Sequence, residues 1–159
     1  MTAATADEGL ADRVGAILRD HAGLEGPLLP VLHAVQAELG HIPEAALPVI
    51  ARALNISRAE VHGVVSFYHD FREQPAGRHV LRVCRAEACQ AVGGRDLGDH
   101  AKAVLGIGWH ETTPGGGLTL EPVYCLGLCA CGPAAMLDGK PLGRVDAKRL
   151  DAILAGVGA

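Results

Sequence analysis

The sequence predicts an α+β protein in which a small helical bundle at the N-terminal end is followed by a small sheet with helices packed on it. Three observations predict this class. Residues 1–74 carry apolar side chains at helical spacing, Pro75 and Gly77 break that pattern, and strand-like runs then alternate with helices over residues 75–159. A chain of 159 residues is long enough for two small domains. We therefore expect one domain at 1–74 and another at 75–159.

Four amphipathic helices are expected in the first region, at residues 8–23, 26–40, 43–55 and 57–71. Pro43 suits the first turn of the third helix, whereas Pro48 interrupts its interior. Ser57 and Glu60 form a capping box at the start of the fourth, because each side chain can bind the other residue's free backbone N–H group. We expect the apolar stripes to form a bundle core, with docking on a partner subunit as the alternative.

The second region changes to strands and helices in alternation. Strands are expected at residues 79–84 and 118–125, with a helix at 94–108 between them. A hairpin is expected to turn at Asp138–Gly139, and a last helix over 146–156 has Asp146 as its expected cap. This order suits a small sheet with helices packed on it.

Composition and charge exclude several classes of function. Hydrophobic residues make up 49% and aromatic residues 3%, so the core is expected to be aliphatic, with Phe67, Tyr68 and Phe71 among its few aromatic members. The formal net charge of −4 argues against a nucleic-acid partner, which would require a basic face. No apolar run has the length of a membrane span and no secretory signal is visible, so we expect a cytoplasmic chain with reduced thiols and no membrane insertion.

The five cysteines gather in two clusters. Cys84 and Cys89 form a C-x4-C pair, and Cys125 and Cys129 form a C-x3-C pair with Cys131 close behind. Each pair follows directly on an expected strand. Two strands paired in one sheet would bring both loops to the same edge, so four thiolates could converge on one point.

Four converging thiolates suit zinc or an iron–sulfur cluster. The residues around the second pair are small and apolar, which leaves room for sulfide, supplies backbone N–H donors and restricts water. This favours a cluster, while structural zinc, thiol redox chemistry and plain buried cysteines remain alternatives. A redox C-x-x-C motif is absent, and no histidine lies in the cysteine loops. Cys131 is expected to be a free buried thiol, with ligand exchange or a redox-active C-x-C with Cys129 as the alternatives.

The cysteine pattern and its flanking residues resemble a known family. "SFYHDFREQPAGRHVLRVC", the Gly93–Gly94 pair and "TLEPVYCLGLC" resemble the thioredoxin-like 2Fe–2S subunit of NADH-dehydrogenase modules, found in respiratory complex I, NAD-linked hydrogenases and NAD-dependent formate dehydrogenases. The resemblance runs from about Leu28 to the C-terminus. It implies a thioredoxin-like 2Fe–2S ferredoxin domain after the helical bundle. It also implies one 2Fe–2S cluster, with four ligands: Cys84, Cys89, Cys125 and Cys129.

Within that family, "CRAEACQAVGG" and "CLGLCACGPAAM" look most like the gamma subunit of soluble, molybdenum-containing NAD-dependent formate dehydrogenase. This implies a non-catalytic electron-transfer subunit beside a partner that carries FMN and the NAD(H) site. Formate would be oxidised at a molybdenum centre in a further, iron–sulfur-containing subunit. The equivalent subunit of complex I or of an NAD-linked hydrogenase is the alternative, and a zinc-stabilised interaction module is a more remote one. The chain itself has no G-x-G-x-x-G motif and no nucleophile–base pair, so we expect no catalytic residue.

Four further side chains lie near the cysteines in the sequence. His79 and His110 could tune a cluster through hydrogen bonds, although ordinary surface or core roles are the simpler expectation. Arg82 and Arg85 flank Cys84, where they could offset the negative charge of a four-thiolate cluster or simply face solvent.

Overall fold

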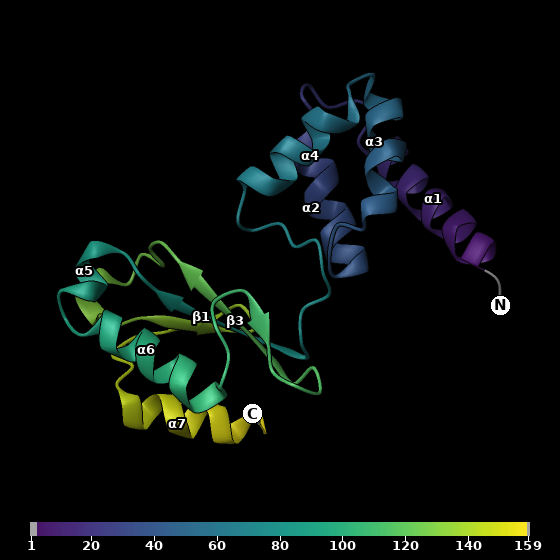
Figure 1. Ribbon diagram of the computed structural model, residues 1–159. Coiled ribbons are helices and arrows are strands. Elements are labelled where there is room, and N and C mark those ends of the chain that lie inside the picture. Colours follow the sequence, from purple (N-terminus) through teal and green to yellow (C-terminus); the bar gives the residue numbers. More distant parts are fainter. Residues whose placement is uncertain (1–2, 159) are drawn as a thin grey trace. The chain divides into compact units, whose positions relative to one another are not determined.

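The computed structural model describes the backbone of residues 3–158 and the side chains of residues 9–158. The chain divides into two compact units, Met1–Pro75 and Ala76–Ala159 (Figure 1). The domain boundary that the sequence predicts after residue 74 lies next to this division. None of the helices in the described part of the chain has the length and apolar character that a bilayer crossing requires.

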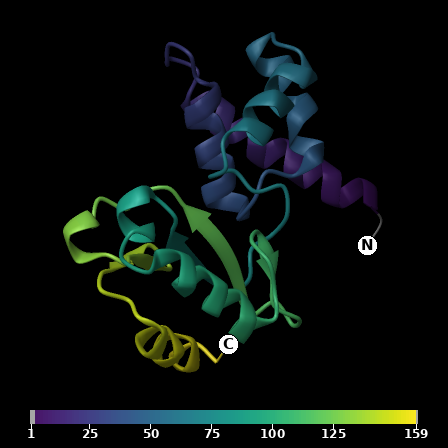
Figure 2. The same cartoon turned by 60° about the vertical axis from the view of Figure 1, so that its left-hand side comes forward.

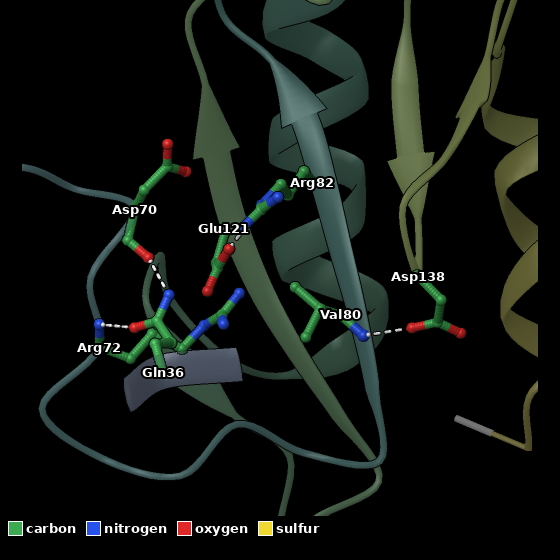
Figure 3. Close-up of polar contacts among 7 residues, drawn as sticks. All are labelled: Gln36, Asp70, Arg72, Val80, Arg82, Glu121 and Asp138. Carbon is green, nitrogen blue, oxygen red and sulfur yellow. Dashed lines mark hydrogen bonds and ion pairs between the residues drawn. The ribbon is translucent and has the colours of Figure 1, made fainter. Parts of the chain in front are cut away.

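The first unit is helical, as its apolar periodicity predicts. The described elements are α1 (Ala3–Asp20), α2 (Leu28–Leu39), the 3-10 helix η1 (Glu44–Ala46), α3 (Leu47–Leu54) and α4 (Arg58–Phe67), which pack together in Figure 2. Their shared core is aliphatic, and its fully buried side chains include Val14, Leu32, Val35, Ile50 and Val61. The side chain of Gln36 also bonds to the chain after α4, donating to the Asp70 carbonyl and accepting from the Arg72 N–H group (Figure 3).

The helix ends follow local chemistry, with one correction. The capping box predicted at Ser57 and Glu60 is present in full. The helix predicted over 43–55 instead starts as the 3-10 turn, and α3 begins only at Leu47. Pro48 therefore lies in the first turn of α3, where the N–H group that proline lacks would have no partner in the helix.

The prediction that all three aromatic residues at the end of α4 are buried is wrong for two of them. Phe71 is buried in the helical core, but the exposed fraction is 74% for Phe67 and 43% for Tyr68. Val61 and Val65 define the buried side of α4 at a spacing of four residues. Two further residues turn Phe67 about 200° from Val65, away from that side.

The second unit is a five-stranded sheet with strand order β2-β3-β1-β4-β5. The central strands β1 (His79–Cys84) and β3 (Leu118–Val123) are parallel, and every other neighbouring pair is antiparallel. The remaining elements are β2 (Glu111–Thr112), β4 (Ala135–Leu137), β5 (Lys140–Leu142), α5 (Glu87–Gln90), α6 (Gly94–Leu105), the 3-10 helix η2 (Cys129–Cys131) and α7 (Ala147–Gly156). This mixture of helices and sheet confirms the expected α+β class.

The sheet has one apolar face and one polar face at β1 and β3, because successive side chains of a strand point to opposite faces. Leu81 and Leu120 are fully buried on the face that packs against α6 and α7. Arg82 and Glu121 face each other across β1 and β3, and their Nε and Oε2 atoms lie 2.8 Å apart (Figure 3). Burial of the apolar side chains against α6 and α7 therefore determines which residues of β1 and β3 face these helices.

The hairpin turn and the last helix form where the sequence predicts them. Asp138 and Gly139 both have positive φ, at 48° and 78°, as a tight two-residue hairpin turn requires. The Asp138 carboxylate accepts from the Val80 N–H group at 2.9 Å, which ties the turn to β1 (Figure 3). The Asp146 side chain caps α7 by accepting from the Arg149 N–H group.

Candidate functional site

The two cysteine loops lie at the same edge of the sheet because β1 and β3 are parallel. Cys84 is the last residue of β1 and pairs in register with Val123, the last residue of β3. The strand predicted to reach Cys125 thus ends two residues earlier, and Cys125 lies in the loop beyond it. The convergence of the loops matches the sequence-based expectation, whereas the role of the cysteines as ligands stays a prediction.

The four cysteines form two pairs that differ in exposure. Cys84 and Cys89 are buried, with exposed fractions of 1% and 2%, and their thiols share a hydrogen bond. Cys125 and Cys129 are exposed, and their Sγ atoms lie 3.8 Å apart. The pairs are close enough for Cys89 and Cys129 to interact electrostatically. Cys131 has intermediate exposure, and all five thiols are free.

The buried pair is held by a tightly closed loop. The Gln90 side chain donates to the Arg85 carbonyl at 2.7 Å, which links the start of the loop to α5. Gly94, the first residue of α6, packs directly on Cys89: a Cβ atom at Gly94 would lie 2.6 Å from the Cys89 carbonyl oxygen. Only glycine fits there, which gives a physical reason for the second glycine of the Gly93–Gly94 pair.

The exposed pair is held by a loop with an unusual backbone. Cys125 has φ of 98°, a conformation that costs a non-glycine residue about 1–3 kcal/mol. In this conformation the N–H groups of Cys125 and Leu126 face the Cys84 sulfur. Gly127, with φ of 74°, donates its N–H group to Cys125 Sγ at 3.4 Å. The loop thus directs backbone donors toward sulfur atoms, as its small residues predict.

The thiol pKa values reflect burial, N–H donors and mutual repulsion. Burial acts to raise the pKa of Cys84, but hydrogen bonds from the Ala86 N–H group, the Cys89 thiol and the second loop lower it overall. Burial, followed by the hydrogen bond and charge of Cys84, raises the pKa of Cys89. The hydrogen bond and charge of Cys125 raise the pKa of Cys129. Bound cations would relieve this repulsion between thiolates.

An apolar shell covers the buried side of the site. Ala134 is buried, and its carbonyl accepts from the Cys84 N–H group at 2.9 Å while its own N–H group faces the Cys89 sulfur. The partly buried side chains packed around these residues are Ala86, Val123, Leu126 and Leu128. Water is therefore restricted on the side of Cys84 and Cys89 and admitted on the side of the exposed pair.

The donor set fits a 2Fe–2S cluster. Two pairs of thiols suit two irons, backbone N–H groups are directed at sulfur, and the buried side is apolar. Within residues 9–158, no group of three or more His, Cys, Asp or Glu side chains is arranged to hold a single metal ion. The residues that would hold the cluster are the four predicted from the sequence: Cys84, Cys89, Cys125 and Cys129.

The charged residues near the cysteines in sequence have separate partners in the structure. Arg82 is paired with Glu121 on the polar face of the sheet. His79 lies at the opposite end of β1 from Cys84, and its Nδ1 atom is 2.8 Å from the Asp138 carboxylate, so a tuning role for His79 is wrong. The backbone N–H group of His110 donates to the carbonyl of Leu120 within the sheet, and a tuning role for the His110 ring stays a prediction.

Two contributors to the site carry no strong signal in the sequence. Ala134 supplies both a carbonyl and an N–H group to the buried pair, which only the pairing of β4 with β1 brings close. The Trp109 ring lies under the guanidinium of Arg85, whose Cζ atom is 5.3 Å from the ring centroid. The contact of Trp109 with Arg85 depends on tertiary packing. The only sequence signal is that Trp109 is the single tryptophan of the chain.

The chain is similar in sequence to a known protein family and to subunits of redox enzymes. Residues 14–158 match the family model described as thioredoxin-like [2Fe-2S] ferredoxin. An NADH-quinone oxidoreductase subunit of Rhizobium meliloti is 38% identical over 127 residues, which cover 80% of this chain and 76% of that protein. The HndA subunit of an NADP-reducing hydrogenase of Solidesulfovibrio fructosivorans is 36% identical over 132 residues, covering 82% of this chain and 77% of that protein.

A solved structure has the same fold over most of the chain. The crystal structure of an NAD⁺-reducing [NiFe]-hydrogenase in the H₂-reduced state matches with a TM-score of 0.70 and 28% sequence identity. The match covers 83% of this chain but only 22% of the hydrogenase chain. The likeness therefore concerns one part of a larger polypeptide.

Proposed function

This chain belongs to the thioredoxin-like [2Fe-2S] ferredoxin family, and from that premise we propose that it is an electron-transfer subunit whose cluster is held by Cys84, Cys89, Cys125 and Cys129. The observation that carries the proposal is the meeting of the two cysteine pairs beyond the paired ends of β1 and β3. When bound, a 2Fe–2S cluster takes up and releases one electron at a time. The chain supplies four thiolates, backbone N–H groups directed at sulfur and an apolar wall.

The exposed pair is the side on which electrons enter and leave. Cys125 and Cys129 are exposed, and the neighbouring Tyr124 side chain is 65% exposed. Cys84 and Cys89, by contrast, are buried. Because electron transfer needs a short path between redox centres, a partner would dock against the exposed pair.

The proposed partner carries FMN and the NAD(H) site. Two similar chains are named as subunits of an NADH-quinone oxidoreductase and of an NADP-reducing hydrogenase, and the similar structure is an NAD⁺-reducing hydrogenase. All three names couple a nicotinamide nucleotide to another redox pair. An NADH-dehydrogenase-type module is therefore the assembly in which we expect this chain to act.

Within this class we propose the gamma subunit of a soluble NAD-dependent formate dehydrogenase. The support is the likeness of "CRAEACQAVGG" and "CLGLCACGPAAM" to that subunit. A further subunit with molybdenum and iron–sulfur centres would then oxidise formate, and electrons would pass to FMN and NAD⁺. The equivalent subunit of complex I or of an NAD-linked hydrogenase is the alternative. A cytoplasmic location stays a prediction.

Matched cysteine variants test the ligand set. Cys89→Ser removes a buried thiol of the proposed set, and Cys131→Ser removes a thiol outside it. We expect Cys89→Ser to lose iron or to change the visible absorption of the cluster, because a serine oxygen would replace one of the four thiolates as the iron ligand. Cys131→Ser should keep both. Iron and a spectrum equal to wild type in Cys89→Ser would contradict the ligand assignment.

Purification from the native cells tests the parent complex. An affinity tag on this chain should retain the partner subunits, whose FMN, molybdenum and iron contents can be measured. Formate-dependent NAD⁺ reduction by the purified complex is the expected result. Hydrogen-dependent reduction, or NADH oxidation by quinone, would instead identify one of the alternative parents while leaving the electron-transfer role in place.

A further inference from the structure

We propose that the Arg85 guanidinium raises the reduction potential of the cluster, and that Trp109 acts as the positioning residue that holds it there. The proposal rests on the proposed function, because it places the cluster at Cys84 and its three partners. The four cysteines alone do not set the reduction potential of a cluster. The packing around Arg85, the first residue after Cys84, supports an effect of its charge.

The backbone of Arg85 is fixed from both sides. Its N–H group donates to the Val123 carbonyl at 2.8 Å, which continues the pairing of β1 with β3 beyond Cys84. Its carbonyl accepts from the Gln90 side chain at 2.7 Å. The side chain of Arg85 therefore starts from a fixed position, one residue from a proposed ligand.

The far end of the side chain is held by an aromatic ring. The Arg85 Cζ atom lies 5.3 Å from the centroid of the Trp109 ring, within the range of a cation–π contact. Trp109 is partly buried against the core of the second unit. Gly98 of α6 makes room for the ring, since a Cβ atom there would lie 3.1 Å from Trp109 Cζ2. Trp109 is thus a rigid support for the guanidinium.

The other cation at this ring has a polar partner of its own. Lys102 Nζ lies 5.7 Å from the same ring centroid, but it is paired with the Asp99 carboxylate at 2.7 Å. Among the ion pairs of the described residues, none within 4.0 Å includes Arg85. Lys102 is the main cause of the lowered pKa of Asp99, and the charge of Arg85 adds to it from a greater distance. Because no ion pair holds the Arg85 guanidinium to that carboxylate, its charge also acts on the neighbouring thiolates.

A fixed cation at this position favours the reduced cluster. Reduction adds one electron, and with it one negative charge, to a group held by four thiolates; the electron comes from the partner subunit, or from dithionite in the experiment below. Cys84 and Cys89 are buried, so solvent screens the interaction with Arg85 less than it would at an open surface. The reduced state gains more from the cation than the oxidised state does, and the potential rises.

A redox titration of the purified subunit, followed by EPR, tests the role of Arg85. Arg85→Gln should shift the reduction equilibrium toward the oxidised form by several-fold to about tenfold, and tenfold corresponds to about 59 mV for one electron. Arg85→Lys keeps the charge and should retain most of the wild-type potential. An unchanged potential in Arg85→Gln, with the cluster present, would overturn the proposal.

Arg78→Gln is the matched control. Arg78 is exposed next to the opposite end of β1, where it contacts the Gly115 carbonyl. Arg78 lies six positions before Cys84 along the extended chain, which corresponds to about 20 Å at the usual rise per residue. That distance is about two Debye lengths at ordinary salt, so removing this charge should leave the potential unchanged. If the reduction potential shifted equally in both arginine variants, the cause would be the net charge of the chain, and a specific role for Arg85 would be contradicted.

The role of Trp109 is tested by a double-variant cycle. Trp109→Leu should lower the potential less than Arg85→Gln does, because the guanidinium is kept but is no longer held in place. In the Arg85→Gln background, Trp109→Leu should add little, since the group on which it acts is gone. Equal effects of Trp109→Leu in both backgrounds would show that the ring does not act through Arg85.

Iron and sulfide analysis of every variant separates the two proposals. A wild-type chain without a cluster would refute the proposed function itself. A normal cluster whose potential is insensitive to Arg85→Gln would refute only the present inference. If Arg85→Gln does not hold a cluster, the reduction potential of Trp109→Leu tests the inference instead. A potential below that of wild type supports the role of Arg85, and an unchanged potential overturns it.

Discussion

The two cysteine pairs of this chain follow neighbouring parallel strands, yet they are built differently. Cys84 and Cys89 are buried, and their loop is held by close packing against Gly94 and by the backbone groups of Ala134. The loop with Cys125 and Cys129 is exposed and contains backbone in the left-handed region. One pair is fixed by its surroundings and the other by its own backbone.

The difference assigns separate tasks to the two pairs. The buried pair sets the local electrostatics, because burial and N–H donors act most strongly where water is excluded. On the proposed function, the exposed pair would give a redox partner access to the site. A strained loop at such a position is expected where function requires a particular direction of backbone N–H groups. Substitutions at Gly94 and Gly127 test whether the two loops depend on these different supports, and a substitution at Asp138 provides a comparison far from both loops.

The largest effect on stability is expected from Gly94→Ala, which disrupts the packing of Gly94 against Cys89. The added Cβ atom would lie 2.6 Å from the Cys89 carbonyl oxygen, so α6 or the loop must move. We expect a loss of about 1–3 kcal/mol in the free energy of unfolding, typical of overpacking. Cluster content should also fall. Urea denaturation and iron analysis measure the two effects.

Gly156→Ala in α7 is the control for that substitution, because no atom lies within 4 Å of the position that its Cβ would take. It should leave the free energy of unfolding unchanged or raise it slightly. Wild-type stability and iron content in Gly94→Ala would mean that the buried loop is not held by this contact.

A smaller effect is expected from Gly127→Ala in the exposed loop. Nothing lies within 4 Å of the added Cβ atom, so the only cost is the positive φ of 74°. Left-handed backbone costs an ordinary L-residue about 1–2 kcal/mol, and a flexible loop can relieve part of it. The measured loss in unfolding free energy should therefore be below that of Gly94→Ala. The reverse order would contradict the proposed difference between the two loops.

The smallest effect is expected at the far end of β1, where Asp138 contacts His79 and Val80. Burial acts to raise the pKa of Asp138, but the hydrogen bonds from the His79 ring and the Val80 N–H group lower it overall. Because the folded-state pKa is lowered, the stabilisation is present above the unfolded value of about 3.9 and is lost as the pH falls through the folded value. Solvent exposure keeps its size below about 1 kcal/mol.

Asp138→Asn measures this contribution, since asparagine tolerates the positive φ of the turn but carries no charge. The unfolding free energies of wild type and Asp138→Asn should differ near neutral pH and approach each other in acid. A constant difference across that range would show that the carboxylate charge contributes nothing. Cluster content should not change, because the turn lies at the end of β1 opposite Cys84.

Local signals in the sequence predicted much of the fold. The capping box at Ser57, the hairpin turn at Asp138–Gly139 and the Asp146 cap were each found where the sequence placed them, because each depends on neighbouring residues alone. Membership in the ferredoxin family confirms the thioredoxin-like fold and the expectation of one 2Fe–2S cluster. The assignment to a formate dehydrogenase stays a proposal.

The errors lie where tertiary packing decides. The short strand β2 pairs with β3 over only two residues, which is too few for a periodic signal. Phe67 is hydrophobic enough for a core position, but its place around α4 leaves it exposed. The exit of Cys125 from the sheet and the packing of Trp109 depend on contacts between distant residues, so the spacing of the cysteines could not reveal them.

Iron and acid-labile sulfide analysis of the anaerobically purified chain, with an EPR spectrum after dithionite reduction, tests the central claim most directly. The account predicts about two irons and two sulfides per chain and an S = 1/2 signal, as a one-electron-reduced 2Fe–2S cluster gives. One zinc ion per chain, with no sulfide and no EPR signal, would contradict it and favour a zinc-stabilised interaction module.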